Sequence, residues 1–156
     1  MSLFEFNSDC IEDYQSHLFD LDVEAFQLSC GKFYNSHNIF FLPNITLGFR
    51  HFSGEVAHDA RLNKEQFYFV LPTKNIEIIV DGKTLSTDNL YYVTPSEQTL
   101  SRFPKNFSAY FFSFSLTQLQ RYFTEEEIQL LVNNNESIRL EKIQLPNLAK
   151  FRTAIE

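Results

Sequence analysis

The sequence has little of what redox, metal and membrane chemistry require. Its only two cysteines, Cys10 and Cys30, do not have the Cys-x-x-Cys spacing of zinc and thiol-redox motifs. No apolar run is long enough to resemble a signal peptide or to span a membrane. These absences predict a cytoplasmic protein without a membrane partner, because reduced cysteines are the rule in that compartment.

Basic residues are also few. Thirteen Lys and Arg stand against twenty Asp and Glu, which gives a formal charge of −7. Such a charge repels a phosphate backbone unless the basic residues gather on one face, and the sequence shows no cluster of that kind. The chain by itself is therefore not expected to bind DNA or RNA.

Tryptophan is absent, yet the apolar residues are unusually aromatic, with eighteen Phe and seven Tyr. A chain of 156 residues suits one domain, which removes roughly 70% of its unfolded surface from water. We therefore expect a single domain over residues 1–156, with a core that is rich in ring packing and needs no disulfide.

From Lys32 onward, short apolar runs alternate with turn residues. The runs are "NIFFL", "ITLGFRHF", "VAHDARL", "FYFVL", "IEIIV", "LYYV" and "FSAYFFSF". Seven or so strands at this spacing are typical of an antiparallel sandwich or barrel, so the predicted fold class is mainly β. Further upstream, "LDVEAFQLSC" is interpreted as a short helical turn that runs into a strand.

One predicted hairpin imitates a phosphate-binding motif. "DGKT" at 81–84 resembles the end of a P-loop, but the glycine cradle would need a glycine where the chain has Glu77. The preceding "IEIIV" alternates apolar residues on one face of a strand, and Asp81-Gly82 supplies the backbone geometry of a tight turn. A hairpin is therefore the better interpretation.

After Ser115 the apolar period changes from two to about 3.6. Ser115-x-x-Gln118 and Thr124-x-x-Glu127 have capping-box spacing and predict two helices. The stripe expected to dock these helices on the barrel is Leu116, Leu119 and Phe123. A third helix is expected to begin near Pro146, with a stripe formed by Leu148, Phe151 and Ile155. The predicted barrel thus spans about residues 1–115, and a helical segment follows over about 116–156.

Catalytic and metal-binding patterns are missing. Metal-dependent cupins, which are enzymes built on small barrels, use an H-x-H pair, and no two histidines here are separated by one residue: His17, His37, His51 and His58. In one alternative, His51 and His58 face each other across the Ser53-Gly54 turn and bind a metal with Glu55 or Asp59. There is no G-x-S-x-G nucleophile elbow. We predict no catalytic residue, no metal and no cofactor, with a stand-alone cupin-type metalloenzyme or a small-molecule-binding barrel as the alternative.

What remains is an aromatic barrel with a few polar residues on its strands. Ligand sites are apolar concavities in which a few polar groups orient a carboxylate or a hydroxyl. Five side chains are candidates for this role at a pocket mouth: Arg50, Arg61, Tyr68, Tyr92 and Arg102. Each is also explained as an ordinary surface arginine or rim tyrosine, so both interpretations are kept.

The order of these features resembles one family. Residues 67–97, "FYFVLPTKNIEIIVDGKTLSTDNLYYVTPSE", and residues 102–123, "RFPKNFSAYFFSFSLTQLQRYF", are similar to the N-terminal domain of AraC-type bacterial transcription regulators. The similarity lies in a strand ending in Leu-Pro, a strand with a glycine turn, an "L-Y-Y-V-x-P" strand, a last barrel strand and helices. It extends over roughly residues 25–123. It implies a cupin-like barrel that binds an effector, followed by helices used for dimerisation.

In that family a separate C-terminal domain with two helix-turn-helix motifs contacts DNA. No such pair is expected within residues 1–156, since the acidic run Glu125-Glu126-Glu127 opens one of the predicted helices. The resemblance therefore implies the regulatory half of a longer regulator, which reaches DNA only through a domain outside this sequence. It also implies an unknown small-molecule effector and a homodimer, whose interface we expect at Leu148, Phe151 and Ile155.

Overall fold

The computed structural model describes residues 2–18, 21–43, 45–62, 66–74, 76–86, 91–93, 98–132 and 138–139. Within these ranges antiparallel strands dominate and the helices are short. None of the described helices combines the length and the apolarity that crossing a membrane requires. The mainly β prediction is confirmed.

The elements follow one another along the chain in a simple order. The strands are β1 (Ser2–Ser8), β2 (Leu21–Gln27), β3 (Asn35–Phe41), β4 (Ile45–Phe52), β5 (Val56–Leu62), β6 (Gln66–Pro72), β7 (Glu77–Val80), β8 (Lys83–Ser86), β9 (Tyr91–Val93), β10 (Thr99–Phe103), β11 (Phe107–Ser115) and β12 (Ile138–Arg139). The helices are α1 (Ile11–Ser16), α2 (Leu116–Leu119) and α3 (Glu125–Val132).

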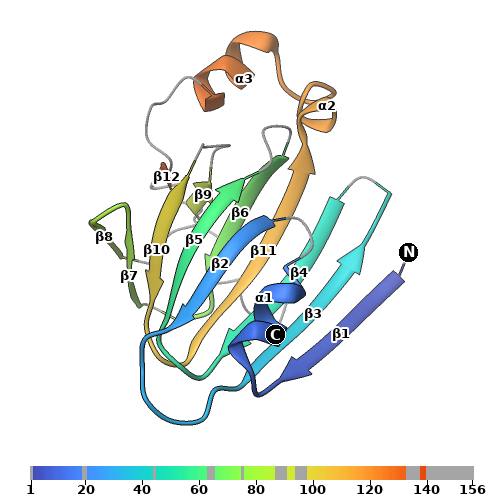
Figure 1. Cartoon of the computed structure of the whole chain (residues 1–156). Coiled ribbons are helices and arrows are strands. Elements are labelled where there is room, and N and C mark those ends of the chain that lie inside the picture. The colour runs from blue at the N-terminus through green and yellow to red at the C-terminus, as the bar shows by residue number, and fades with distance from the viewer. Residues whose placement is uncertain are drawn as a thin grey trace.

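The strands form two sheets that face each other (Figure 1). Sheet A has the order β1-β3-β4-β11-β6-β9-β12, and sheet B has the order β2-β5-β10-β7-β8. The long strand β11 lies at the centre of sheet A, where it pairs antiparallel with β4 on one side and with β6 on the other. This architecture is the predicted cupin-like sandwich or barrel.

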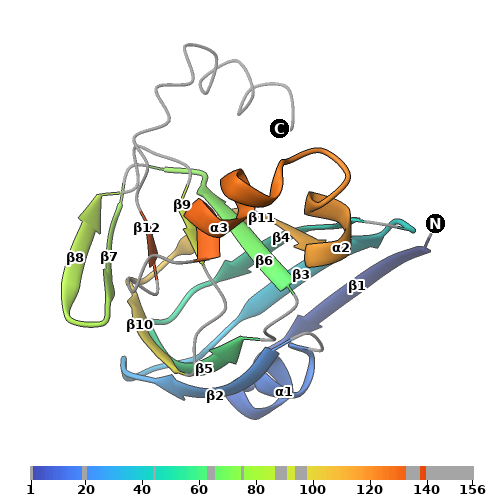
Figure 2. The ribbon, with the colours of Figure 1, turned by 90° about the horizontal axis from the view of Figure 1, so that it is seen from above.

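Alternate residues of each strand point into the space between the sheets, where the core lies. On β11, Phe107, Ala109 and Ser113 are buried on the inner face, whereas Ser108 and Tyr110 lie on the outer face. The core cluster joins both sheets with α1: Tyr14, Leu18, Val23, Ala25, Phe33, Phe52, Val56, Ala60, Ile78, Val80, Leu85, Phe107 and Ala109. Seen from above, α1 lies beside β1 and β2, so this helix closes one side of the sandwich (Figure 2).

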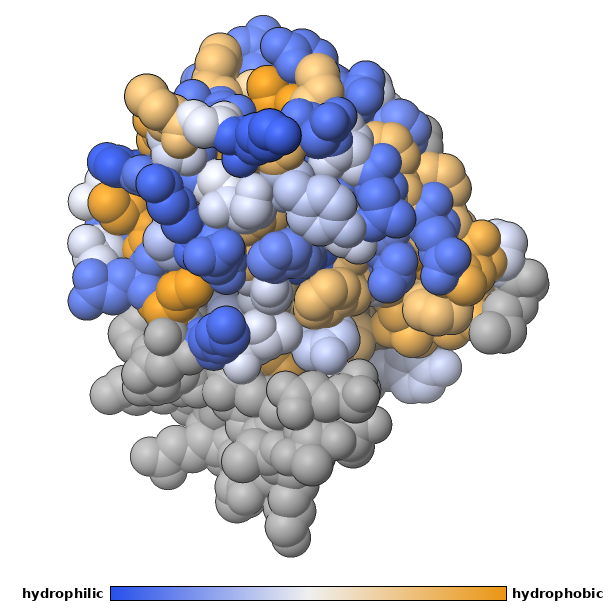
Figure 3. Space-filling model, turned by 90° about the horizontal axis from the view of Figure 1, so that it is seen from below, coloured by the Kyte–Doolittle hydropathy of each residue, from blue (hydrophilic) through white to orange (hydrophobic). Residues whose placement is uncertain are grey.

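Aromatic rings fill the lower end of the sandwich. The ring centroids of Phe52 and Phe107 are 5.3 Å apart, and those of Phe103 and Phe107 are 4.8 Å apart. Phe33 is buried in the same cluster. Figure 3 shows this end from below, covered by side chains of mixed hydropathy. The core is rich in ring packing, as the composition predicts.

Three predicted turn and cap signals form as expected. The Ser115 N–H donates to Gln118 Oε1 at 3.4 Å, and the Thr124 N–H donates to Glu127 Oε2 at 2.8 Å, so both capping boxes are present. Asp81-Gly82 joins β7 to β8, and both residues have positive φ, 46° and 76°. The hairpin interpretation of "DGKT" is therefore confirmed.

Helices α2 and α3 pack on the outer face of sheet A, over β6 and β11. Leu119 and Ile128 are buried there against Phe67, and Leu116 packs beside them. Phe123 is 45% exposed, so its predicted part in docking is wrong. The reason is that α2 ends at Leu119, and the helical period that aligned Phe123 with the stripe does not continue that far.

The first thirty residues differ from the prediction. The stretch interpreted as a helical turn entering a strand is strand from its start, because alternation along β2 buries Val23 and Ala25. Neither β1 nor α1 is predicted from the sequence. β1 is an edge strand of sheet A whose residues are exposed or half-buried, so its apolar alternation is weak.

Part of the helical segment expected over 116–156 belongs to sheet A. Ile138 and Arg139 form β12 and pair with β9. The predicted third helix near Pro146 and its stripe, formed by Leu148, Phe151 and Ile155, lie outside the described residues.

Candidate functional site

Polar side chains gather between the two sheets and form what we call the inner polar cluster: Tyr14, Asn35, His37, Arg50 and His58. Tyr14, Asn35 and His37 are 0% exposed, and His58 is 6% exposed. Arg50 is half-buried. Histidine, asparagine and arginine side chains are uncommon in so aromatic a core, so the cluster is the candidate site.

Strand alternation places Asn35, His37 and Arg50 on the inner face of sheet A. On β3, Asn35 and His37 share a face with the buried Ile39, and on β4 Arg50 shares a face with the buried Phe52. The register pairs His37 directly with Arg50. Directly opposite residues of antiparallel strands have Cβ atoms about 4.5–5.5 Å apart, so these two side chains are immediate neighbours.

Helix α1 links the two sheets through Tyr14. Its hydroxyl oxygen lies 2.8 Å from Nε2 of His58, which comes from β5 of sheet B, and this hydrogen bond is buried. The ring centroids of Tyr14 and His37 are 5.1 Å apart, with the rings edge to face. Tyr14 therefore contacts a histidine of each sheet.

Several polar atoms of the cluster have no hydrogen-bond partner. Asn35 Oδ1, both ring nitrogens of His37 and Arg50 Nε are buried and unpaired within the described ranges. The Asn35 amide group donates to the Ser8 carbonyl at 3.2 Å, so the oxygen is the unused part of that side chain. Each buried polar atom without a partner destabilises a fold by about 1–3 kcal/mol. Four of them in one cluster provide hydrogen-bonding capacity for a bound molecule.

Burial keeps both histidines of the cluster neutral. Desolvation, followed by the charge of Arg50, lowers the pKa of His37 to about 2 and the pKa of His58 to about 3. Desolvation also raises the pKa of Tyr14. At neutral pH the charge of the inner polar cluster is therefore that of the Arg50 guanidinium alone.

The Arg50 guanidinium lies among rings rather than carboxylates. Its Cζ atom is 5.7 Å from the ring centroid of Tyr14 and 5.2 Å from that of Phe111. Within the described ranges no buried residue is acidic. An ion pair between described residues joins Arg102 to Glu55, away from the cluster. The cluster thus contains a positive charge that ring faces stabilise and no described carboxylate neutralises.

Solvent reaches part of the inner face. Phe111 of β11 and Val70 of β6 are paired with each other on the inner face of sheet A, and both are only half-buried, as is Arg50. Phe52 and Phe107 at the lower end are 0% and 3% exposed. The accessible part of the inner face is therefore at Arg50, Val70 and Phe111, since Tyr68 and Ser113, which follow toward the α2 end of β11, are buried again.

The five residues predicted to contact a ligand do not form one site. Arg50 lies in the inner polar cluster. Tyr68 is buried on the inner face of β6, where its hydroxyl donates to Gln66 Oε1 at 3.2 Å. Arg61 is exposed on β5. Tyr92 belongs to β9, where its backbone pairs with β6 and with β12.

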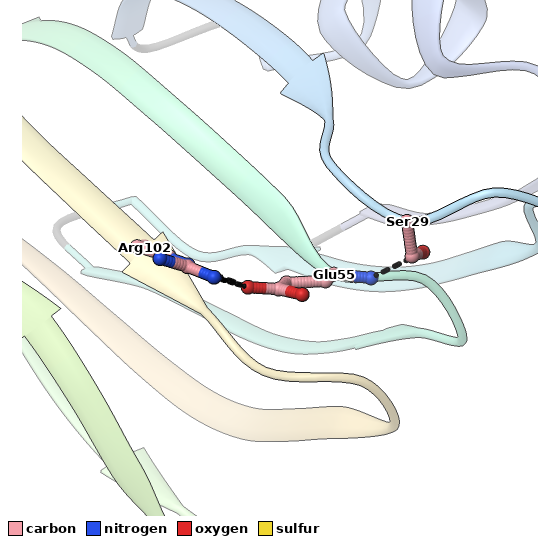
Figure 4. Close-up of polar contacts among 3 residues, drawn as sticks. All are labelled: Ser29, Glu55 and Arg102. Carbon is pink, nitrogen blue, oxygen red and sulfur yellow. Dashed lines mark hydrogen bonds and ion pairs between the residues drawn. The ribbon is translucent and has the colours of Figure 1, made fainter.

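Arg102 points away from the interior. Its guanidinium contacts the Glu55 carboxylate, and the Glu55 N–H donates to Ser29 Oγ at 3.0 Å (Figure 4). The Arg102 side chain is 54% exposed, and an ion pair this open to water contributes little stability. Alternation explains the outward direction of Arg102 and Arg61, because each follows a residue that faces the core.

The alternative metal site at His51 and His58 is wrong. His51 lies on the outer face of β4, where its Nδ1 is 2.8 Å from Ser108 Oγ, whereas His58 lies on the inner face of sheet B. The turn at Ser53-Gly54 connects β4 to β5, but on β4 it is Phe52 rather than His51 that points inward. Among the described residues, no three His, Cys, Asp or Glu side chains are placed to hold a metal ion.

Four members of the cluster are not predicted as ligand contacts: Tyr14, Asn35, His37 and His58. A signal exists for two of them, since alternation in "NSHNIFF" places Asn35 and His37 on the face of Ile39. The pattern does not say that this face is the inner one. Tyr14 and His58 meet across 44 residues of sequence, and only the tertiary fold shows that contact.

Comparisons with known proteins support the fold. No protein-family model and no curated protein matches the sequence. Among solved structures, the AraC-like transcriptional activator CuxR matches with a TM-score of 0.63 and 11% identity, over 99% of this chain and 67% of the CuxR chain. The Schizosaccharomyces pombe Cnp3 cupin domain matches with a TM-score of 0.40 and 15% identity, over 56% of this chain and 70% of that one. The Clostridium difficile EutQ protein matches with a TM-score of 0.39 and 13% identity, over 54% of this chain and 70% of the EutQ chain.

The likeness to CuxR extends over nearly all of the chain, and at 11% identity it is a likeness of fold. It confirms the fold that the family resemblance implies. The chain has the mainly β, cupin-like fold that is also present in an AraC-like activator.

Proposed function

We propose that the chain is the regulatory domain of an AraC-type transcription regulator, which binds a small-molecule effector at the inner polar cluster and has no catalytic role. The observation that carries this proposal is a set of buried, unpaired hydrogen-bonding atoms beside a half-buried arginine. The fold shared with CuxR supports it, since CuxR is an AraC-like transcriptional activator.

Strand β11 connects the proposed effector site to the helices. Its inner residues Ala109 and Phe111 lie beside Arg50, and the strand leads directly into α2. On its outer face, Phe114 packs in the same cluster as Leu119. Suppose that β11 has two arrangements, each with its own placement of α2 and α3. An effector that binds one arrangement more tightly shifts the equilibrium toward it, by an amount set by the difference between its affinities for the two arrangements.

Dimerisation and DNA binding belong to the same proposal. We expect the helical segment to hold two copies of the chain together, and a separate domain of the same polypeptide to contact DNA. The match to CuxR covers 67% of that chain, which is consistent with a longer regulator. The effector then acts by changing how the dimer presents its DNA-binding domains.

Small molecules retained through purification test effector binding. The wild type and an Arg50→Gln variant are purified from the same cells and denatured, and the released molecules are identified by mass spectrometry. We expect a molecule that the wild type releases and rebinds, and that Arg50→Gln binds more weakly. Arg61→Gln changes an exposed arginine and should bind as the wild type does. If no molecule is released and a metabolite library produces no thermal shift, effector binding is contradicted and the domain is a dimer scaffold.

Metal analysis of the freshly purified protein separates this proposal from the metalloenzyme alternative. We expect less than one equivalent of any transition metal, unchanged in a His37→Gln variant. One equivalent of metal that is lost in His37→Gln would instead favour a metalloenzyme with a ligand in the inner polar cluster.

A further inference from the structure

The inner polar cluster has one positive charge and no described negative charge to neutralise it. Within the described ranges every acidic side chain is exposed or half-buried, and none is buried beside Arg50. Removing a cation from water without giving it a counter-ion destabilises a fold. We propose that the ligand of this cluster is a small carboxylate, whose two oxygens pair with the Arg50 guanidinium. This inference rests on the proposed effector function.

The unpaired atom of Arg50 indicates how the anion binds. Nε is the buried donor without a partner. Together with the neighbouring terminal nitrogen, Nε presents two parallel N–H groups along one edge of the guanidinium, and their spacing matches the two oxygens of a carboxylate. A neutral ligand with a single acceptor atom would use one of these donors and leave the charge without a counter-ion.

His37 adds a third donor to the same place. It is the direct cross-strand neighbour of Arg50, and both of its ring nitrogens are unpaired. A neutral imidazole has one N–H donor and one acceptor nitrogen, so it can donate to a carboxylate oxygen that Arg50 holds. The unused groups of these two residues are thus complementary to one carboxylate.

The surroundings favour a carboxylate over a phosphate. A phosphate monoester has about two negative charges and three acceptor oxygens at neutral pH, whereas the cluster offers one guanidinium. His37 and His58 remain neutral and add no positive charge. The rings of Tyr14 and Phe111 flank the guanidinium and present apolar surface to the body of a ligand. A single negative charge on an apolar or aromatic body fits this site.

Binding of simple carboxylates tests the inference. The probes are acetate, benzoate, inorganic phosphate and benzamide, which has the shape of benzoate without its charge. Calorimetric titration and thermal shift with up to about 10 mM of each probe detect millimolar affinity. We expect acetate or benzoate to bind the wild type at least tenfold more tightly than phosphate or benzamide.

Three variants at two arginines locate the binding. Arg50→Gln removes the charge and should weaken carboxylate binding at least tenfold. Its own melting temperature should be no lower than that of the wild type, because an unneutralised cation is removed. Arg50→Lys keeps the charge without the parallel pair of donors and should bind with intermediate affinity. Arg61→Gln should leave the affinity unchanged, because Arg61 is exposed.

Other outcomes overturn the inference in distinguishable ways. Equal affinity for benzoate and benzamide shows that the site does not recognise the negative charge of the ligand. Tighter binding of phosphate than of acetate and benzoate shows that the site does not prefer a carboxylate. If Arg50→Gln does not fold, undiminished carboxylate affinity in Arg50→Lys contradicts the paired contact. A neutral molecule released from the purified protein, with no carboxylate binding, overturns the carboxylate and leaves the effector function intact. If there is neither a released molecule nor binding of any probe or library compound, both proposals fail.

Discussion

Tyr14 shows how a single residue connects a helix to both sheets. It is the buried residue of α1, its hydroxyl is hydrogen-bonded to His58, and its ring lies against His37 and near Arg50. The hydroxyl is removed from water, so its contribution depends on its buried partners, of which His58 lies at 2.8 Å. Deleting the oxygen also leaves the partner nitrogen unpaired, which is the more destabilising half of the change.

Tyr14→Phe is expected to lower the free energy of unfolding by about 1–3 kcal/mol, because it removes a buried hydrogen bond and keeps the ring. Urea denaturation followed by circular dichroism measures the change. Tyr34→Phe is the matched control, since Tyr34 is 47% exposed and its hydroxyl donates to Asn7 at the surface. The control should change stability by less than about 0.5 kcal/mol. Equal losses in the two variants would show that the Tyr14–His58 contact has no special role.

The buried histidines make stability depend on pH. In the unfolded chain a histidine takes up a proton near pH 6.5, whereas in the fold the pKa values of His37 and His58 are about 2 and 3. Between these limits the unfolded state binds more protons, so the free energy of unfolding falls as the pH falls below about 6.5. Together the two histidines lower the free energy of unfolding by about 4 kcal/mol between pH 7 and pH 5. The carboxyl pKa values of Glu12 and Glu127 are lowered from 4.5 and contribute below this window.

Urea denaturation at pH 7, 6 and 5 measures this loss, and His58→Gln tests its source. The glutamine retains a hydrogen-bonding group for Tyr14 but has no proton to gain. We expect its stability to fall by about half as much as that of the wild type, since only His37 remains to titrate. A variant as sensitive to pH as the wild type would mean that the pKa of His58 in the fold is close to its value in the unfolded chain.

At the scale of elements, β4 and β11 fit together because one of them has a glycine. Gly48 pairs with Phe111, and the Phe111 ring lies across it: a Cβ atom at position 48 would be 2.0 Å from Phe111 Cζ. Gly48 has ordinary backbone angles, so the space for the ring is the reason for glycine rather than the backbone conformation. The same ring contacts Arg50. The glycine therefore helps to shape the proposed effector site.

Gly48→Ala is expected to destabilise the domain by about 1–3 kcal/mol, because the methyl group displaces the Phe111 ring from its place between β4 and Arg50. A double-mutant cycle with Phe111→Ala checks the cause, since the glycine change should cost less once the ring is gone. A coupling energy near zero would show that the ring has room to move aside. The same variant should also weaken carboxylate binding, because Phe111 flanks the guanidinium.

Elements with strong local signals are predicted well from the sequence. Three such signals form: the capping boxes at Ser115 and Thr124 and the turn at Asp81-Gly82. Each depends only on hydrogen bonds or backbone angles within four consecutive residues. β1 and α1 lack such signals, since β1 is an edge strand and α1 is too short for a helical period. Phe123 fails for a related reason, because a four-residue helix ends before its predicted stripe is complete.

At the scale of the whole molecule, the site is harder to predict than the fold. Arg50 is one of three arginines proposed from the sequence, and strand alternation alone cannot show that it points inward while Arg61 and Arg102 point outward. That distinction depends on which face of each strand meets the other sheet. Tyr14 and His58 come together only when α1 closes the side of the sandwich. A polar cluster assembled from four separate elements leaves no local pattern in the sequence.

Self-association is the property of the whole molecule that the proposed function most requires. The stripe of Leu148, Phe151 and Ile155 has helical spacing, and a helix with one apolar stripe must bury it against its own barrel or against a second copy. Leu119 and Ile128 dock α2 and α3 on sheet A, and the resemblance to AraC-type regulators favours a second copy for the later stripe. We expect a homodimer with a dissociation constant in the micromolar range, about −8 kcal/mol.

Sedimentation velocity across a dilution series should show reversible dimerisation, and Phe151→Asp should shift the protein to monomer while its β-type circular dichroism stays intact. Tyr122→Asp is the matched control, because Tyr122 is an aromatic residue that is 84% exposed between α2 and α3. If Tyr122→Asp dissociates the dimer and Phe151→Asp does not, the interface lies at the α2–α3 segment. If Phe151→Asp unfolds the domain, Phe151 belongs to the core of the monomer, because a charge placed in a dimer interface prevents association without removing the fold of each copy.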